Sequence, residues 1–339
     1  MKPTFPAGKL PLRFLEGLLA KLPAGDGRVR IGPQVGEDAA LIDMGNRYLV
    51  AKTDPVTFAT DRIGWYVVNI NANDVACMGA DPKWLLVTCL LPEYGTDAEI
   101  VESLFADLST ACSELGITLC GGHTEVTLGL DRPILVGQLL GEVDKDRFVD
   151  KRNIRPGDVV LLTKGIAVEG TCVIARERGA LLENKVPREI LERAKGFLKN
   201  PGISVVKDAR VALEAVGPGI HGMHDPTEGG LVQGVRELAI RAGVGMRIES
   251  EKIPVFPETT ALTEPFGIDP MGLLASGALL LVASPSCEER LRCALQDAGI
   301  PCARIGQVCS AGEGLEWIRR GRAVALPEFV SDELLKALG

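Results

Sequence analysis

Residues 71–82 read NANDVACMGADP and form the end of the first long helix that the sequence predicts. That helix covers residues 64–77, where Val67, Ile70 and Val75 are apolar. One strand precedes it over residues 48–54, and another follows over residues 84–91. Polar and glycine residues therefore gather where regular elements end, and there a ligand can approach the backbone closely.

The remaining predicted elements indicate a mixed protein with two domains. The first half adds a helix over residues 97–115 closed by Gly116, strands over 117–120 and 133–143, and a loop over 121–132. The second half has strands over 159–163, 279–283 and 306–309 and helices over 169–179, 188–198, 231–242 and 288–298. Because strands and helices do not alternate strictly, the α+β class is favoured over a parallel doubly wound sheet. A turn signal at residues 155–158 divides the chain into predicted domains of residues 1–150 and 151–339.

Composition and charge argue against several classes of protein. The chain has 339 residues, 46% of them hydrophobic and 24% charged, as in folded domains. Its formal net charge of -8 repels polyanions, so no nucleic-acid partner is expected. No apolar run reaches the roughly 18 residues of a membrane span, and no basic and apolar leader opens the chain. We therefore expect a cytoplasmic protein without membrane contact.

Nine cysteines are scattered along the chain in an odd number and without a C-x-x-C pair. Most lie in apolar surroundings, such as those of Cys89 and Cys120, where cysteine behaves as a small hydrophobic residue. We expect reduced and mostly buried thiols. With three histidines in the whole chain, a structural zinc site has too few ligands.

Three aspartates lie in polar segments at the ends of predicted elements. They are Asp38 in GEDAA (36–40), Asp54 in TDP (53–55) and Asp74 in NANDV (71–75). Carboxylate oxygens are the ligands that Mg²⁺ prefers, and the ion usually shares them with substrate phosphates. Together the three predict a metal site. Taken singly, each could instead be a turn residue, a local cap or a solvated charge.

The order of five motifs resembles the aminoimidazole ribonucleotide (AIR) synthetase superfamily, also called PurM-like. The motifs are GEDAA, TDP, NANDVACMGADP, GGHTEV (121–126) and HDPTEGGL (224–231). The resemblance implies an N-terminal domain whose mixed or antiparallel sheet pairs across a homodimer, and a C-terminal α/β sandwich domain that completes the cleft. It also implies ATP and Mg²⁺ as cofactors.

Site residues are carried over from the resemblance motif by motif. It implies metal ligation by Asp38, Asp54, Asp74 and Glu125, nucleotide binding by Lys9, Asp38, Asn73, Gly121, Gly122, Thr124, Asp225 and Glu228, and catalysis by Asp54, Asp74 and His123. His123 replaces the aspartate of the usual GGDT motif, and Glu125 is expected to compensate. Structural alternatives are a tight turn at the glycines, a hydrogen-bonded His123, a helix cap at Asp225 and a solvated Lys9.

Within this superfamily, the motifs of the sequence are most similar to those of the hydrogenase expression/formation protein (HypE) branch. That branch ends in a cysteine carrying the carboxamide that ATP dehydrates to a nitrile, whereas this sequence ends in SDELLKALG and its last cysteine is Cys309. We expect an enzyme that uses ATP to phosphorylate or activate an oxygen of a small-molecule or protein acceptor. The alternatives are a kinase like thiamine-monophosphate kinase, or a catalytically silent ATP-binding maturation or scaffold protein. Selenophosphate synthetase is disfavoured because no cysteine precedes Cys77.

Overall fold

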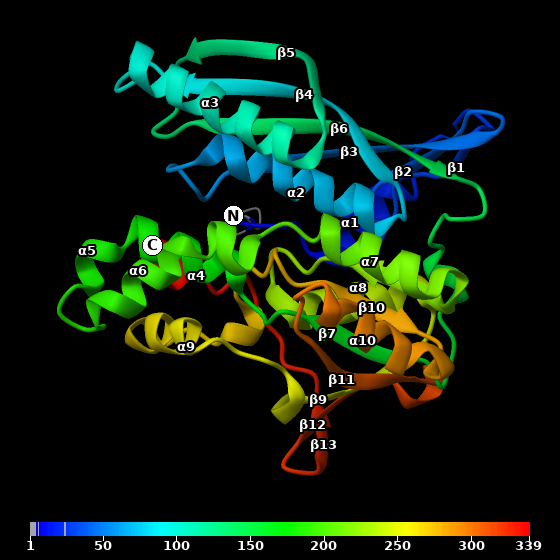
Figure 1. The fold of residues 1–339 in the computed structure, drawn as a ribbon. Helices are drawn as coiled ribbons and strands as arrows, with labels where there is room; N and C mark the ends of the chain where they lie inside the picture. Colours follow the sequence, from blue (N-terminus) through cyan, green and yellow to red (C-terminus); the bar gives the residue numbers. More distant parts are fainter. Residues whose placement is uncertain (1–4, 6, 24) are drawn as a thin grey trace. The chain divides into compact units, whose positions relative to one another are not determined.

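The computed structural model describes residues 5, 7–23 and 25–339, which divide into two compact units. The N-terminal unit comprises residues 27–32 and 38–148. The C-terminal unit comprises residues 33–37 and 149–339 and the described residues before position 27. Each unit is built on its own mixed sheet with helices, which confirms the predicted α+β class (Figure 1). Assigning all of residues 1–150 to one domain stays a prediction.

The N-terminal unit holds a six-stranded sheet in the order β1-β2-β3-β6-β4-β5. All neighbouring strands are antiparallel except β4 and β5. Helices α2 and α3 lie along one face of this sheet (Figure 1). The bounds are β1 Val29–Ile31, β2 Ala40–Asp43, β3 Arg47–Val56, α2 Ile63–Cys77, β4 Asp81–Pro92, α3 Ala98–Leu115, β5 Thr118–Thr127 and β6 Ile134–Asp144.

Helix α2 forms the centre of the N-terminal unit, and all of its residues are buried. It packs against β3, β4 and β6 on one side and against α3 on the other. Gly64 permits the close approach to α3, because a Cβ there would lie 2.6 Å from the Leu104 carbonyl oxygen. As predicted, α3 ends at Gly116, whose φ of 68° is left-handed. The helices and strands predicted for this half are confirmed, with one exception.

The exception is the predicted loop over residues 121–132, which was wrong for residues 121–127, whereas residues 128–132 do connect β5 to β6 as a loop. Strand β5 continues to Thr127 and pairs in parallel with β4. The pairing slips by one residue at Cys120, whose thiol donates to the Leu85 carbonyl at 3.4 Å. The glycines that suggested a loop are instead needed for strand contact: a Cβ on Gly122 would lie 2.0 Å from the Val87 carbonyl oxygen.

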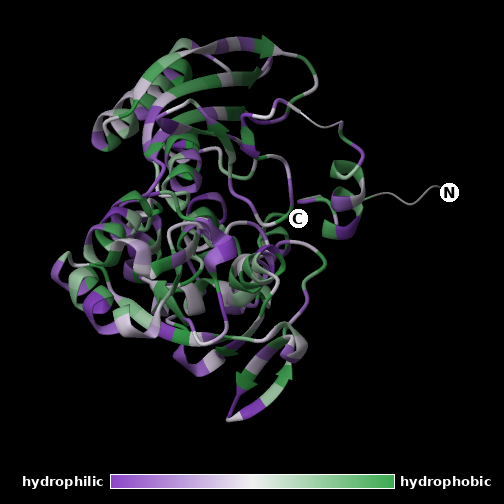
Figure 2. Cartoon of the chain, turned by 90° about the vertical axis from the view of Figure 1, so that its right-hand side faces the viewer, coloured by the Kyte–Doolittle hydropathy of each residue, from purple (hydrophilic) through white to green (hydrophobic). Residues whose placement is uncertain are grey.

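The C-terminal unit holds a seven-stranded sheet in the order β13-β12-β9-β11-β7-β10-β8. Its strands are β7 Val159–Thr163, β8 Ile220–His224, β9 Gly245–Glu249, β10 Leu280–Ala283, β11 Cys302–Cys309, β12 Leu315–Arg319 and β13 Arg322–Ala325. Its helices are α1 Leu12–Leu19, α4 Val168–Glu177, α5 Gly179–Leu182, α6 Arg188–Gly196, α7 Val206–Val216, α8 Gly230–Ala242, α9 Pro257–Thr263, α10 Glu288–Asp297 and α11 Leu335–Leu338. Strands β7, β8 and β10 are buried along their whole length. Figure 2 shows hydrophobic and hydrophilic residues following one another along the helices and strands.

The strands and helices predicted for the second half are confirmed, but other elements escaped prediction, namely α5, α7, α9, α11, β9, β12, β13 and β8. Strand β8 is one example. Its sequence, IHGMH, carries two histidines and a glycine and lacks the composition typical of a buried strand. His221 is tolerated inside because its Nδ1 lies 2.8 Å from the Asp158 carboxylate. This pairing depends on residues far apart in the sequence.

All nine cysteines are free thiols, and five of them are buried, including Cys89. The expectation of a buried Cys120 was wrong, because β5 is an edge strand and leaves this side chain exposed. None of the helices in the described ranges combines the length and apolarity needed to cross a membrane.

Candidate functional site

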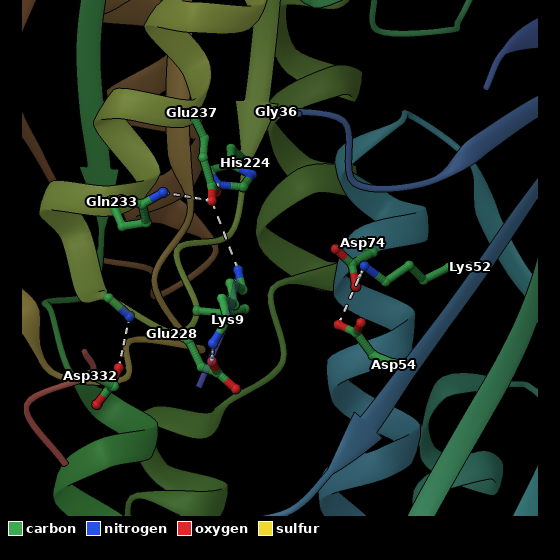
Figure 3. Close-up of polar contacts among 12 residues, drawn as sticks. Lys9, Gly36, Lys52, Asp54, Asp74, His224, Glu228, Gln233, Glu237 and Asp332 are labelled. Atoms are coloured by element: carbon green, nitrogen blue, oxygen red, sulfur yellow. Dashed lines mark hydrogen bonds and ion pairs between the residues drawn. The ribbon is translucent and has the colours of Figure 1, made fainter. Parts of the chain in front are cut away.

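The carboxylates of Asp54 and Asp74 converge on a single cation in the N-terminal unit. Lys52 Nζ lies 3.3 Å from Asp54 Oδ2 and 3.2 Å from Asp74 Oδ2 (Figure 3). The Asp54 side chain is 33% exposed and the Asp74 side chain 6%, so one of the two acids faces solvent. The structure therefore brings together two of the three aspartates that the sequence singled out.

The local structure explains the convergence. Lys52 and Asp54 are two residues apart on β3 and share one face of the strand. Asp74 and Asn71 are three residues apart on α2 and share one face of the helix. Because α2 packs against β3, these two faces meet.

Asn71 fixes the end of β3 against α2. Its Oδ1 accepts the Asp54 backbone N–H at 2.9 Å, and its Nδ2 donates to the Asp54 carbonyl at 3.3 Å and to the Val67 carbonyl at 2.8 Å. Gly137 makes room for it, since a Cβ there would lie 2.4 Å from Asn71 Nδ2. The sequence prediction missed Asn71 and chose Asn73, although both stand in the NANDV motif.

The other predicted residues of this region occupy separate positions. Asn73 is fully buried in α2, on a different helix face from Asn71 and Asp74. Asp38 is buried directly before β2. The joining of Asp38 to the Asp54–Asp74 pair stays a prediction.

The donor set at Lys52 fits a divalent cation. Two carboxylates placed around one positive charge supply hard oxygen ligands, and Mg²⁺ commonly uses one or two carboxylates together with phosphate oxygens. The Lys52 ammonium group balances the two acids in this structure. It can also neutralise phosphate as a point charge.

The GGHTE segment lies on β5, at the opposite edge of the sheet from β1. His123 Nε2 lies 3.0 Å from Glu125 Oε2, and both side chains are exposed. Being two residues apart on a strand, they point to the same face, and Thr124 points to the other. Packing against β4 accounts for Gly122 without a ligand. Phosphate contact by Gly121, Gly122 and Thr124, and metal binding by Glu125, stay predictions.

The HDPTEGG segment of the C-terminal unit contacts the N-terminal residue Lys9. The Lys9 backbone N–H donates to Glu228 at 3.1 Å (Figure 3). Its Nζ donates to the Thr227 hydroxyl at 3.1 Å. Lys9 Nζ also lies 3.9 Å from Glu237 Oε1. The Lys9 side chain is 47% exposed, so it is accessible to solvent and also hydrogen-bonded to a turn far along the chain.

The Glu237 side chain on α8 forms several polar contacts near this turn. It accepts from Gln233 Nε2 at 3.0 Å, and its other oxygen lies 3.0 Å from His224 Nε2. Burial raises the pKa of Glu237, but the charge of Lys9 and the contact with His224 outweigh it and hold this pKa at about 2. Glu237 is thus a fixed negative charge.

Glu169 on α4 has a raised pKa, in contrast to Glu237. Burial raises its pKa to about 8, and the negative charges of Asp332, Glu228 and Asp225 act in the same direction. Its Oε2 has no hydrogen-bond partner within the described parts of the chain. Near neutral pH Glu169 is therefore mostly a neutral carboxylic acid. The periodicity of the sequence could not identify Glu169, because its raised pKa depends in part on three acids that are distant in the sequence.

Two family matches cover most of the chain. Residues 36–143 match the N-terminal domain of AIR synthase related proteins, and residues 155–318 match the C-terminal domain of the same proteins. The chain therefore belongs to the AIR synthase related family, as the motif order predicted.

The chain is similar to individual proteins of two kinds. The chain is 26% identical over 288 residues to the carbamoyl dehydratase HypE of Cupriavidus necator, with 82% of this chain and 78% of the relative covered. The solved structure of the hydrogenase maturation protein HypE in complex with ATP superposes with a TM-score of 0.70 at 24% identity, covering 94% of this chain and 91% of that one. AaThiL complexed with AMPPCP and TMP gives a TM-score of 0.68 at 23% identity, covering 88% and 91%. The two structural likenesses establish the fold.

Proposed function

We propose that this protein binds Mg²⁺-ATP and uses it to phosphorylate or activate an oxygen atom of an acceptor. The observation that carries the proposal is the convergence of Asp54 and Asp74 on Lys52 Nζ. Support also comes from the family membership and from the ATP and AMPPCP complexes of structurally similar proteins.

Each group has a defined task in this proposal. Asp54 and Asp74 would hold Mg²⁺, and the bound ion would supply positive charge to offset that of the phosphate groups. Asn71 keeps Asp54 at a fixed backbone position. Lys52 neutralises Asp54 and Asp74 when the ion is absent, and it would neutralise phosphate oxygens when the ion is bound.

The proposal has two alternatives, a small-molecule kinase and a protein that binds the nucleotide without turnover. A kinase like thiamine-monophosphate kinase would transfer the phosphoryl group to a small molecule, and the AaThiL complex with AMPPCP and TMP supports this choice. A silent maturation or scaffold protein would bind the nucleotide without turnover. HypE-like activation of a carboxamide oxygen on a protein or small-molecule acceptor is favoured by the HypE relatives.

The proposal includes a homodimer formed at β5. This strand is an edge of the six-stranded sheet, and nine of its ten residues are exposed. Leu119 and Val126 are 38% and 56% exposed there. A long exposed edge strand with apolar side chains is a ready surface for pairing with a second strand.

Calorimetric titration with Mg²⁺-ATP, followed by an ADP-release screen over candidate acceptors, tests the proposal. An enzyme should bind the nucleotide and release ADP faster when its acceptor is present. Binding without acceptor-stimulated release would favour the silent alternative. Absence of nucleotide binding in the presence of Mg²⁺ would refute the proposal.

A further inference from the structure

The hairpin formed by β12 and β13 carries three arginines at its turn (Figure 1). Arg319 ends β12 and Arg322 begins β13, and the register places these two residues directly opposite each other. Arg320 occupies the turn between them, together with Gly321. All three arginines are exposed. Three positive charges therefore meet at one end of the C-terminal sheet.

This arrangement disfavours the hairpin at two points. Arg320 has a φ of 50°, in the left-handed region that glycine, asparagine and aspartate adopt more readily in such turns. Arg319 and Arg322 are like charges directly across the strand pair, which is a destabilising combination. Charges can guard an edge strand against self-pairing, but Arg320 lies in the turn and not on the strand. Positions that break local rules in this way are expected at functional sites.

Little negative charge offsets the three arginines. Among the residues that the structure describes, no carboxylate forms an ion pair with any of their guanidinium groups. The Arg320 backbone N–H donates to Glu251 Oε1 at 2.7 Å, and this bond, with a smaller effect of the Arg319 charge, lowers the pKa of Glu251. Glu251 therefore supplies one negative charge beside three positive ones. The chain as a whole has a net charge of -8, so the turn is a local exception.

Strand β13 also offers a free backbone edge. It is the outer strand of the seven-stranded sheet, and all four of its residues are exposed. Bonded and non-bonded residue pairs alternate in an antiparallel hairpin, and the turn closes on the bonded pair of Arg319 and Arg322. Ala323 and Ala325 therefore direct their N–H and C=O groups away from β12. An extended peptide can add there as a further strand.

We propose that the edge of β13 binds an extended acidic peptide segment of a partner protein, whose carboxylates face Arg319, Arg320 and Arg322. Pairing with the strand backbone supplies affinity, and the arginines select for acidic residues. A nucleic acid could also meet the arginines, but it has no peptide groups to pair with the strand, and the net charge of -8 repels it. The inference is independent of the proposed nucleotide binding.

Fluorescence anisotropy with a labelled peptide of alternating valine and threonine, flanked by glutamates, tests the site on the full chain. The same peptide with glutamines in place of the glutamates should bind about tenfold more weakly. Arg320→Gly should raise the dissociation constant about threefold while leaving the melting temperature at or above that of wild type, because glycine relieves the left-handed residue. Ala323→Pro removes an outward N–H, which an edge strand tolerates, and should weaken binding about tenfold.

Arg290→Gln is the matched control, because Arg290 is an exposed arginine of α10 in the same unit and outside the hairpin. Its peptide affinity should stay within about twofold of wild type. No saturable binding of the acidic peptide, equal binding of the glutamine peptide, or wild-type affinity in Arg320→Gly would overturn the inference. So would a single-stranded oligonucleotide that binds as tightly as the peptide and is unaffected by Ala323→Pro. Should Ala323→Pro fold poorly, Arg320→Gly decides alone.

Discussion

The side-chain amide of Asn71 pairs with both backbone groups of Asp54, accepting from its N–H at 2.9 Å and donating to its carbonyl at 3.3 Å. A side chain that satisfies a strand residue in this way replaces a neighbouring strand at that point. Helix α2 thereby sets the position of one candidate metal ligand and contributes another, Asp74.

Asn71→Ala should therefore lower both stability and ligand affinity. Two partly buried backbone groups of Asp54 lose their partner, at a cost of about 1 to 3 kcal/mol in the free energy of unfolding measured by urea denaturation. Mg²⁺-ATP affinity should fall as well. Asn69→Ala is the control, because Asn69 donates to the Trp65 carbonyl of its own helix at 2.9 Å. Equal nucleotide affinity in the two variants would contradict a positioning role for Asn71.

Asp54→Asn should weaken Mg²⁺-ATP binding about 10- to 100-fold while changing the melting temperature little. The side chain is one third exposed, so its charge matters more for a ligand than for packing. Calorimetry and thermal denaturation measure the two effects. Asp131→Asn, at a side chain that is 83% exposed on the same unit, should leave both unchanged. A variant of Asp54 with wild-type nucleotide affinity would remove it from the metal site.

Lys52→Met should destabilise the protein in metal-free buffer and make it more responsive to Mg²⁺. Without the ammonium group, Asp54 and Asp74 repel each other, and a divalent cation relieves this repulsion. The rise in melting temperature on adding Mg²⁺ should be several degrees larger than in wild type. Lys145→Met, which breaks a pair with Asp43 at 2.9 Å, should show no such gain. Identical Mg²⁺ responses in both variants would rule out a cation site between the two acids.

Glu169 should make stability decrease with rising pH. Its pKa is raised from 4.5 to about 8, so the folded state binds more protons than the unfolded state between these values. The relative stabilisation is complete below pH 4.5 and is lost as the pH rises through about 8, amounting to a few kcal/mol. Urea denaturation between pH 5 and 8, in wild type and in Glu169→Gln, isolates this contribution. Parallel pH profiles of the two proteins would show that Glu169 ionises normally.

The protein should form a homodimer through β5, visible by light scattering at micromolar concentration. Val126→Glu places a charge on that strand and should produce monomers. Val324→Glu is matched to it, because Val324 is 47% exposed on β13, the edge strand of the other sheet. A monomeric wild type, or dissociation caused by Val324→Glu alone, would contradict pairing at β5.

The sequence by itself determined the α+β class, most helices and strands and the family, because these follow from local periodicity, end signals and motif order. It also selected Asp54 and Asp74, because carboxylates at the ends of predicted elements are suitable ligands for Mg²⁺. Predictions from the sequence failed where segments that are distant along the chain come into contact. The sequence wrongly predicts a loop for residues 121–127 of β5, because the contact of Gly122 with Val87 is not visible in either segment alone.

Only the tertiary structure decided how the acids behave. Packing of α2 on β3 placed Lys52 between Asp54 and Asp74 and selected Asn71 over Asn73. Burial among other acids made Glu169 mostly neutral, whereas Lys9 and His224 kept Glu237 charged. The physical reason is that desolvation and Coulomb interactions depend on distances in space, and residues remote in the sequence set those distances.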